Sequence, residues 1–140
     1  KLNFKVSKIL IDAPCSGEGT IISNKKTLLM WNIKNVFNLS RKQKNILESA
    51  IELLQDEGEI VYSTCTHSPE ENEELIDFIL NKFKNIKLEN PTIPKELKKR
   101  EGIIEWQGKK YSSEVKKCVR IYPHDNNTEG FFIAKLRKVK

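Results

Sequence analysis

Two short apolar segments, each followed at once by polar and loop-forming residues, constrain the fold of this 140-residue chain most strongly. Residues 9–11 (ILI) end at Asp12 and the breaker-rich residues 13–19 (APCSGEG). An uninterrupted apolar run of this kind predicts a strand that is buried on both faces, as in a parallel sheet. Residues 59–65 (EIVYSTC) are rich in β-branched and aromatic side chains, so they predict a second strand.

Helix signals lie between and after these two strands. Apolar residues recur at helical spacing from residue 46 to residue 54, Ser40 occupies an N-cap position, and Gln43 completes a capping box. Gly58 stands where a left-handed C-cap is expected. Ser68 and Pro69, followed by glutamate, predict the start of another helix by capping and by proline at its first position.

The later part of the chain adds strands. Residues 86–88 predict a third strand, and residues 118–122 and 131–136 predict two more on either side of a polar turn. A small hairpin is expected around Gly108. The alternation of strand and helix is typical of an open α/β sheet, and 140 residues suffice for one domain.

Charge is distributed unevenly along the chain. Residues 1–44 hold nine basic and two acidic side chains, residues 45–80 hold ten acidic and no basic ones, and residues 81–140 hold sixteen basic and seven acidic ones. The net charge of +6 suits a polyanionic partner, with the acidic stretch turned elsewhere, although lysine-rich surfaces are often only solvated. No apolar run approaches the roughly 18 residues that span a bilayer, so no membrane segment is expected.

The three cysteines are an odd number and far apart, without a Cys-x-x-Cys pair. This spacing disfavours a disulfide framework and a metal site, and it favours a reducing, cytoplasmic environment. Cys15 and Cys65 follow the two best-defined strands, so parallel strands would bring them to one crevice. Cys118, inside a predicted strand, is expected in the core. Simple packing of each thiol is the alternative, and a cysteine hydrolase with His67 or His124 as base is a weaker one.

Three motifs follow one another along the chain: DAPCSGEG at residues 12–19, STCT with PEENE at residues 63–66 and 69–73, and RIYPH with GFFIA at residues 120–124 and 130–134. In order and spacing they resemble the RNA 5-methylcytosine methyltransferases of the Nol/Nop/Sun family. DNA cytosine methyltransferases also carry a Pro-Cys loop but lack the second Thr-Cys, and this difference favours RNA as the substrate.

The resemblance implies a Rossmann-like α/β methyltransferase fold that uses S-adenosylmethionine. It covers only the C-terminal half of the family's catalytic domain, so residues 1–140 are expected to be a partial domain. That half is a mostly parallel sheet with a C-terminal antiparallel strand. The N-terminal half, with the cofactor-binding strands, is then a required partner, and these 140 residues alone are expected to be inactive.

The resemblance also implies roles for single residues. Cys65 is the nucleophile that adds to C6 of cytosine, and Cys15 assists release of the product. Asp12 polarises the base and borders the cofactor site. Pro14 and Gly17 belong to the wall of a pocket for a base taken out of its stack.

The expected substrate is tRNA first, as in an archaeal tRNA enzyme, and rRNA second, because no long basic extension is visible. Trp106 and Tyr111 flank Lys109 and Lys110, a combination suited to looped RNA, although a plain surface hairpin explains it equally well. A non-catalytic RNA-binding or ribosome-assembly module with the same fold is the alternative function.

Overall fold

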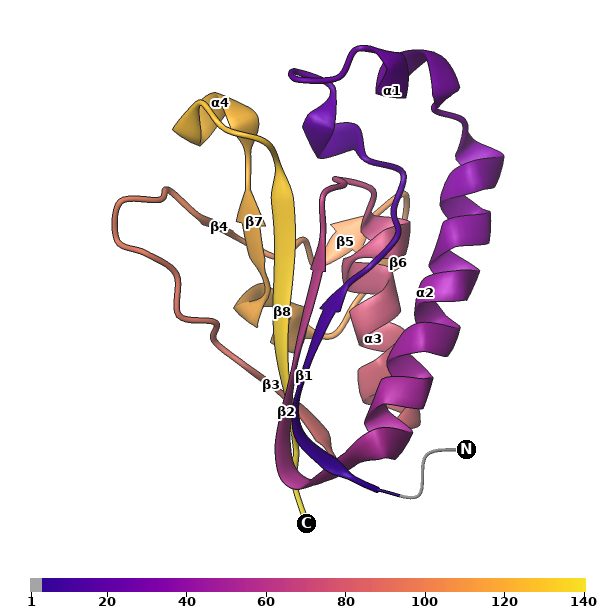
Figure 1. The fold of residues 1–140 in the computed structure, drawn as a ribbon, viewed down its shortest axis with the longest axis vertical. Coiled ribbons are helices and arrows are strands. Elements are labelled where there is room, and N and C mark those ends of the chain that lie inside the picture. The colour runs from indigo at the N-terminus through magenta and orange to yellow at the C-terminus, as the bar shows by residue number, and fades with distance from the viewer. Residues whose placement is uncertain (1–3) are drawn as a thin grey trace.

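The structure is a computed structural model, and it describes residues 4–140. A mixed sheet forms one layer, and the two long helices α2 and α3 lie together on one side of it (Figure 1). The strands have the following bounds: β1 (Val6–Asp12), β2 (Leu54–Thr64), β3 (Ile86–Glu89), β4 (Arg100–Glu101), β5 (Glu105–Trp106), β6 (Lys109–Lys110), β7 (Val119–Ile121) and β8 (Phe131–Lys138). The α-helices are α1 (Lys26–Met30), α2 (Ile33–Leu53), α3 (Glu73–Lys82) and α4 (Pro123–Asn126), and the 3-10 helices are η1 (Glu18–Thr20), η2 (Pro69–Glu71) and η3 (Ser113–Lys117).

The order of the strands places β8 in the middle of the sheet. β1 pairs parallel with β2, and β8 pairs antiparallel with β2, β3 and β7. β1, β2, β3 and β7 therefore run in one direction, with β8 inserted against them and the two-residue β4 at the far edge. This arrangement confirms the expected α/β fold with a C-terminal antiparallel strand: the sheet is mixed, with the early strands β1 and β2 parallel and the later pairings antiparallel.

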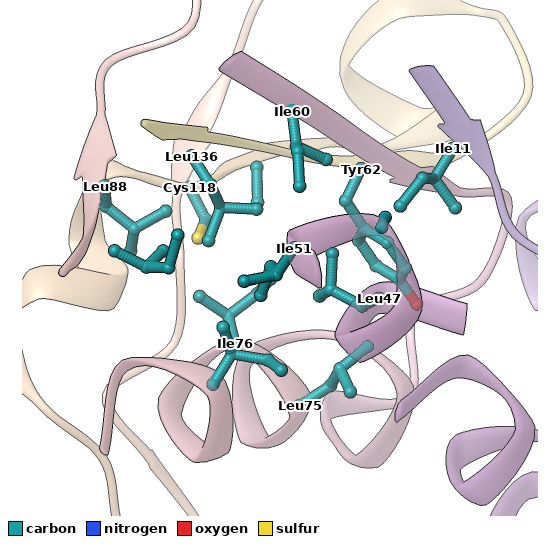
Figure 2. Close-up of a cluster of buried hydrophobic side chains, with 14 of the residues drawn as sticks. Ile11, Leu47, Ile51, Ile60, Tyr62, Leu75, Ile76, Leu88, Cys118 and Leu136 are labelled. Atoms are coloured by element: carbon teal, nitrogen blue, oxygen red, sulfur yellow. The ribbon is translucent and has the colours of Figure 1, made fainter. Parts of the chain in front are cut away.

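The hydrophobic core fills the space between the sheet and the helices α2 and α3 (Figure 2). Alternate residues of β2 and β8 point into it, as the two-residue period of a strand requires. Cys118 is buried there, as expected. Core side chains from the two helices and the two central strands are Leu47, Ala50, Ile51, Leu75, Ile76, Ile79, Leu54, Ile60, Tyr62, Phe132, Ala134 and Leu136.

The first long helix starts earlier than its sequence signals predict. Asn32 is its N-cap, and the Asn32 side chain accepts a hydrogen bond from the backbone N–H of Asn35 at 2.8 Å. The predicted capping box at Ser40 and Gln43 is therefore wrong, because both residues lie buried inside α2. The Ser40 hydroxyl instead donates to the backbone oxygen of Glu70 at 2.8 Å.

Two other predicted caps are also wrong. α2 passes directly into β2 at Leu54, and Gly58 lies within that strand, with Glu57 taking the left-handed φ of 62°. Ser68 makes no side-chain cap: the turn after it is the 3-10 helix η2, and α3 begins only at Glu73. At Ser68 a tertiary contact replaces the cap, because its hydroxyl donates to Glu18.

The hairpin expected around Gly108 is present. β5 pairs antiparallel with β6, and Gln107 and Gly108 at its tip both have positive φ, 48° and 78°. Two successive left-handed residues are typical of the tight turn that joins two antiparallel strands. No helix within residues 4–140 is long and apolar enough to cross a membrane.

Candidate active site

Cys15 and Cys65 meet at the carboxyl end of the two parallel strands. The register of β1 and β2 pairs Asp12 with Ser63, so both chains leave the sheet at the same level. The two Sγ atoms are 3.1 Å apart, and the backbone N–H of Cys65 donates to the Cys15 sulfur at 3.3 Å. Both thiols are free and half-buried. The predicted convergence of the two cysteines is confirmed.

The contact between the thiols separates their acidities. A hydrogen bond from Cys15 lowers the pKa of Cys65 to about 7, against burial and the negative charge of Asp12, which both act to raise it. The same hydrogen bond, together with burial, raises the pKa of Cys15 well above its usual value. Because the thiolate is the nucleophilic form of cysteine, this geometry favours Cys65 as the attacking sulfur and keeps Cys15 protonated.

Close backbone contacts fix the loops that carry the cysteines. The N–H of Gly19 donates to the backbone oxygen of Cys65, and the N–H of Gly130 donates to the oxygen of Gly19, both at 2.9 Å. A Cβ atom on Gly19 would lie 2.5 Å from the oxygen of Gly130. Glycine is therefore required at this crossing of three segments that are distant in sequence.

Glu71 connects the loop around Cys15 to the helix α2. Its Oε2 accepts from the backbone N–H of Ser16 at 3.0 Å and from Nε2 of Gln43 at 2.8 Å, and Gln43 also donates to the oxygen of Pro14 at 2.8 Å. The Ser16 and Thr66 hydroxyls are hydrogen-bonded at 2.7 Å. Burial raises the pKa of Glu71. This network holds the loop after β1 against the loop after β2.

Asn72 braces the segment that contains Cys65. Thr64 Oγ1 donates to Asn72 Oδ1 at 2.7 Å, and Asn72 Nδ2 donates to the oxygen of Thr66 at 3.0 Å. The residues on both sides of Cys65 are thus held by one buried amide. Rigid supports of this kind keep a reacting group within the narrow range of positions that chemistry requires.

A buried ion pair anchors the same region from the other side. Arg120 Nε and Nη2 donate to the two carboxylate oxygens of Glu73, both at 2.6 Å, and the side chains are 2% and 0% exposed. Arg120 Nη1 also donates to the oxygen of His67 at 3.0 Å. The bidentate geometry compensates for the removal of both charges from water.

Glu18 joins three further groups to the site. Its Oε2 accepts from the backbone N–H of His67 at 2.9 Å, and its Oε1 accepts from the Ser68 hydroxyl at 2.7 Å and from Trp31 Nε1 at 2.8 Å. Glu18, Gln43, Glu71 and Arg120 are parts of the site that the sequence motifs alone do not single out. A signal exists only for Glu71, which belongs to the run of glutamates that follows Cys65.

The other predicted site residues lie in the same loop as Cys15. Asp12 is exposed at the end of β1, and Pro14 is exposed one residue before the cysteine. Gly17 has φ 75°, a left-handed conformation that suits glycine, and its oxygen accepts from the backbone N–H of Thr20. The structure therefore brings Asp12, Pro14, Cys15 and Gly17 to one edge of the sheet beside Cys65.

The alternative chemistries receive no geometric support. His67 stacks on Tyr122 and His124 stacks on the same ring, and neither imidazole forms a hydrogen bond with Cys65 within residues 4–140. A cysteine hydrolase requires such a contact between base and nucleophile. The described part of the chain also holds no group of three or more histidine, cysteine or acidic residues suited to a metal ion.

Comparisons with known proteins agree with this geometry. Residues 2–137 match the family model for the 16S rRNA methyltransferase RsmB/F. The chain is 50% identical over 131 residues to the tRNA (cytosine(49)-C(5))-methyltransferase of Pyrococcus abyssi, an alignment that covers 94% of the chain and 41% of that protein.

Solved structures give the same result. A methyltransferase homolog from Pyrococcus horikoshii superposes with a TM-score of 0.83 at 35% identity, over 98% of this chain and 40% of that one. NSun6 from Pyrococcus horikoshii, solved with the S-adenosylmethionine analogue SFG, superposes with a TM-score of 0.75 at 38% identity. This match covers 99% of this chain and 32% of that one. The chain thus spans less than half the length of these relatives. Because the family model matches residues 2–137 of its 140 residues, the chain belongs to the RsmB/F methyltransferase family.

Proposed function

We propose that the protein to which these 140 residues belong transfers a methyl group to C5 of cytosine in RNA, with tRNA as the first candidate substrate and rRNA as the second. The observation that carries the proposal is the pair of thiols 3.1 Å apart at the carboxyl ends of two parallel strands. The tRNA assignment is supported by the enzyme from Pyrococcus abyssi, whose name specifies a tRNA cytosine.

The reaction needs a nucleophile because C5 of cytosine is itself poorly nucleophilic. The Cys65 thiolate adds to C6, the C5–C6 double bond opens, and the ring gains electron density at C5. A pKa of about 7 gives Cys65 a substantial thiolate fraction at neutral pH. A neighbouring thiol that donates a hydrogen bond provides this without any histidine.

Asp12 and the loop that follows it bind and polarise the target cytosine. A carboxyl group at the exposed end of β1 can polarise the ring at N3 and the exocyclic amine, which eases the addition at C6. The Pro14 ring and the backbone around Gly17 form the wall of the pocket that receives a flipped-out cytosine. The hydrogen bond from Gln43 to the oxygen of Pro14 keeps that wall in place.

S-adenosylmethionine, when bound, supplies the methyl group that reaches C5. Of the residues described, Asp12 fits the border of its site, because an exposed carboxylate at the carboxyl end of a parallel strand is a usual contact for such ligands. One exposed carboxylate does not make a complete cofactor site. We therefore assign residues 1–140 to a partial catalytic domain, with the remaining cofactor contacts in the rest of the protein.

Cys15 acts after the transfer. The C5 proton must pass to a base, its electron pair re-forms the C5–C6 double bond, and Cys65 leaves C6 as a thiolate. While Cys65 is bound to carbon it carries no negative charge, so its charge and its hydrogen bond no longer raise the pKa of Cys15, and only burial still does. Cys15 then becomes easier to ionise next to the base, where it assists the release.

The proposal is tested with the whole protein and tRNA transcripts by bisulfite sequencing for 5-methylcytosine. Cys65→Ala should abolish methylation, while Cys118→Ala, a change to a buried cysteine outside the site, should retain it. Substantial 5-methylcytosine from Cys65→Ala would refute the role of Cys65. If the wild-type protein binds RNA but methylates neither tRNA nor rRNA, the alternative function, a non-catalytic RNA-binding module, would be indicated instead.

A further inference from the structure

A cavity of about 360 Å³ lies beside the two cysteine loops and is distinct from the Cys15–Cys65 contact. It shares Glu18 and His67 with those loops, and His67 follows Cys65 by two residues. Its size falls in the range of about 300–1,000 Å³ that is usual for small-molecule sites. Its aromatic walls are Trp31, His67, Trp106 and Tyr122.

Hydrogen bonds to carboxylates hold the two tryptophans in place. Trp31 Nε1 donates to Glu18 at 2.8 Å, and Trp106 Nε1 donates to Glu70 at 3.1 Å. The residues Trp31 and Trp106 nevertheless remain 40% and 39% exposed. The N–H group of each ring is thus satisfied by the protein, while each residue stays partly accessible and lines the cavity. Such fixed, exposed rings are typical of stacking surfaces, because little conformational entropy is lost on binding.

A stack of planar rings forms another wall. The His67 and Tyr122 rings lie 5.2 Å apart at 27°, and His124 also stacks on Tyr122, at 5.3 Å and 29°. His67 Nδ1 is buried and has no hydrogen-bond partner among the residues described. Burial also lowers the pKa of His67, which favours the neutral form of the ring.

The electrostatics limit what can enter. Glu18 and Glu70 place negative charge on the cavity, which disfavours a phosphate group. Arg120, the cation at its edge, is already paired with Glu73 and with the oxygen of His67. Carboxylate oxygens do accept hydrogen bonds from the N–H groups on the edge of a nucleobase. A planar ring with N–H donors therefore fits this cavity, whereas the phosphate backbone does not.

We infer that the cavity binds one unpaired nucleobase of the substrate RNA, from a nucleotide that flanks the target cytosine. This inference rests on the proposed function, because it places RNA at the Cys65 loop. The base stacks on the indole rings while the target base occupies the pocket of Asp12 and Pro14. Proteins that recognise single-stranded RNA commonly bind unstacked bases by stacking them on aromatic side chains.

The test is an abasic scan with the whole protein. Short RNAs carry one abasic site at each position around the target cytosine, and their dissociation constants are measured for the wild type, Trp106→Ala and Trp31→Ala. The wild type should lose affinity at least about fivefold at one flanking position, as expected for the loss of a stacked base. At that position the tryptophan variants should show no further loss, because the abasic site and the variant remove the same contact.

Phe37→Ala, which changes an aromatic side chain of similar exposure on α2, is the control and should preserve the pattern of the wild type. The inference would be overturned if the tryptophan substitutions weakened binding by the same factor for every RNA, including the one that is abasic at the flanking position. Such losses would point to another segment of the protein as the occupant of the cavity.

A second measurement uses only the wild type and does not depend on the variants folding. RNA with 5-iodouridine at the flanking position is photocrosslinked, and the attachment site is mapped by mass spectrometry. Crosslinks at Trp31, His67 or Trp106 are expected, and crosslinks exclusively elsewhere would contradict the inference. Either failure leaves methylation by Cys65 intact, so the proposed function is tested separately.

Discussion

At the scale of single residues, the site depends on one hydrogen bond between two thiols. Cys15 donates to Cys65, and this bond outweighs both burial and the charge of Asp12 in setting the pKa of Cys65 to about 7. The Cys65 thiolate is therefore present above pH 7 and is lost as the pH falls below it. Catalysis by this group should follow the same direction.

The rate at which iodoacetamide alkylates Cys65 in the whole protein should rise through a midpoint near pH 7. Cys15→Ala removes the donor, so the midpoint should move up toward the ordinary value of 9.0. Cys15→Ser keeps a hydroxyl donor and should show a smaller shift. Peptide mapping by mass spectrometry isolates the Cys65 signal, and identical midpoints in all three proteins would disprove the role of this hydrogen bond.

Gly19 gives a second prediction at this scale. Gly19→Ala would place a Cβ 2.5 Å from the backbone oxygen of Gly130 and 2.9 Å from that of Cys65, so the contact between the two cysteine loops must shift. We expect methylation to fall at least about tenfold, since displacements near 1 Å cost about 10²-fold. Gly108→Asn is the control, because a Cβ there meets nothing within 4 Å and asparagine tolerates positive φ. Equal activity in both variants would contradict this account of the crossing.

At the scale of elements, the acidic residues around the start of α3 hold the cysteine loops in place. Glu71, Asn72 and Glu73 are buried, and each contacts a different part of the cysteine loops or of β7. The acidic stretch is expected to face away from a polyanionic partner, and these three residues are used inside the protein, where they are not presented to such a partner.

Breaking the buried ion pair should be costly. Arg120→Met leaves the Glu73 carboxylate buried without its partner, which destabilises proteins by about 3–5 kcal/mol. The double variant Arg120→Met with Glu73→Leu should recover much of this loss, because neither charge is then buried. Urea unfolding of the whole protein measures both. A loss below about 1 kcal/mol in the single variant would show that the pair contributes little.

Strand and helix positions could be predicted from local patterns, but the ends of helices could not. Ser40 and Gln43 have the spacing of a capping box, and their side chains instead cross to Glu70, Glu71 and Pro14. A local pattern carries no information about partners about 30 residues away. The two cysteines were predictable because parallel strands necessarily end at one edge. The supporting contacts of Glu18 and Arg120 were not, since they join segments across the whole chain.

At the scale of the whole molecule, β1 forms an open edge of the sheet. It pairs only with β2 among the described strands, and Leu10 is 74% exposed. An apolar hollow lies beside it, lined by Ile9, Ile11, Ile46, Ala50 and Leu53 among others. Exposed apolar edges of this kind pair with further chain. This surface is where we expect the remainder of the catalytic domain to pack.

The 140 residues expressed alone should therefore self-associate, as measured by analytical ultracentrifugation. Leu10→Lys places a charge on the open strand and should reduce the association. Leu29→Lys is the matched control, because Leu29 is 86% exposed on α1 and lies away from the sheet edge. A monodisperse monomer of the unchanged chain would contradict this assignment of the edge.

The central claim is that Cys65 attacks the base and Cys15 releases it. The most direct measurement is a denaturing gel of the whole Cys15→Ala protein after incubation with tRNA and S-adenosylmethionine. The account predicts a slower band that requires both RNA and cofactor, with the RNA attached at Cys65 by mass spectrometry. Absence of that band with methylation retained, or attachment at another residue, would contradict it.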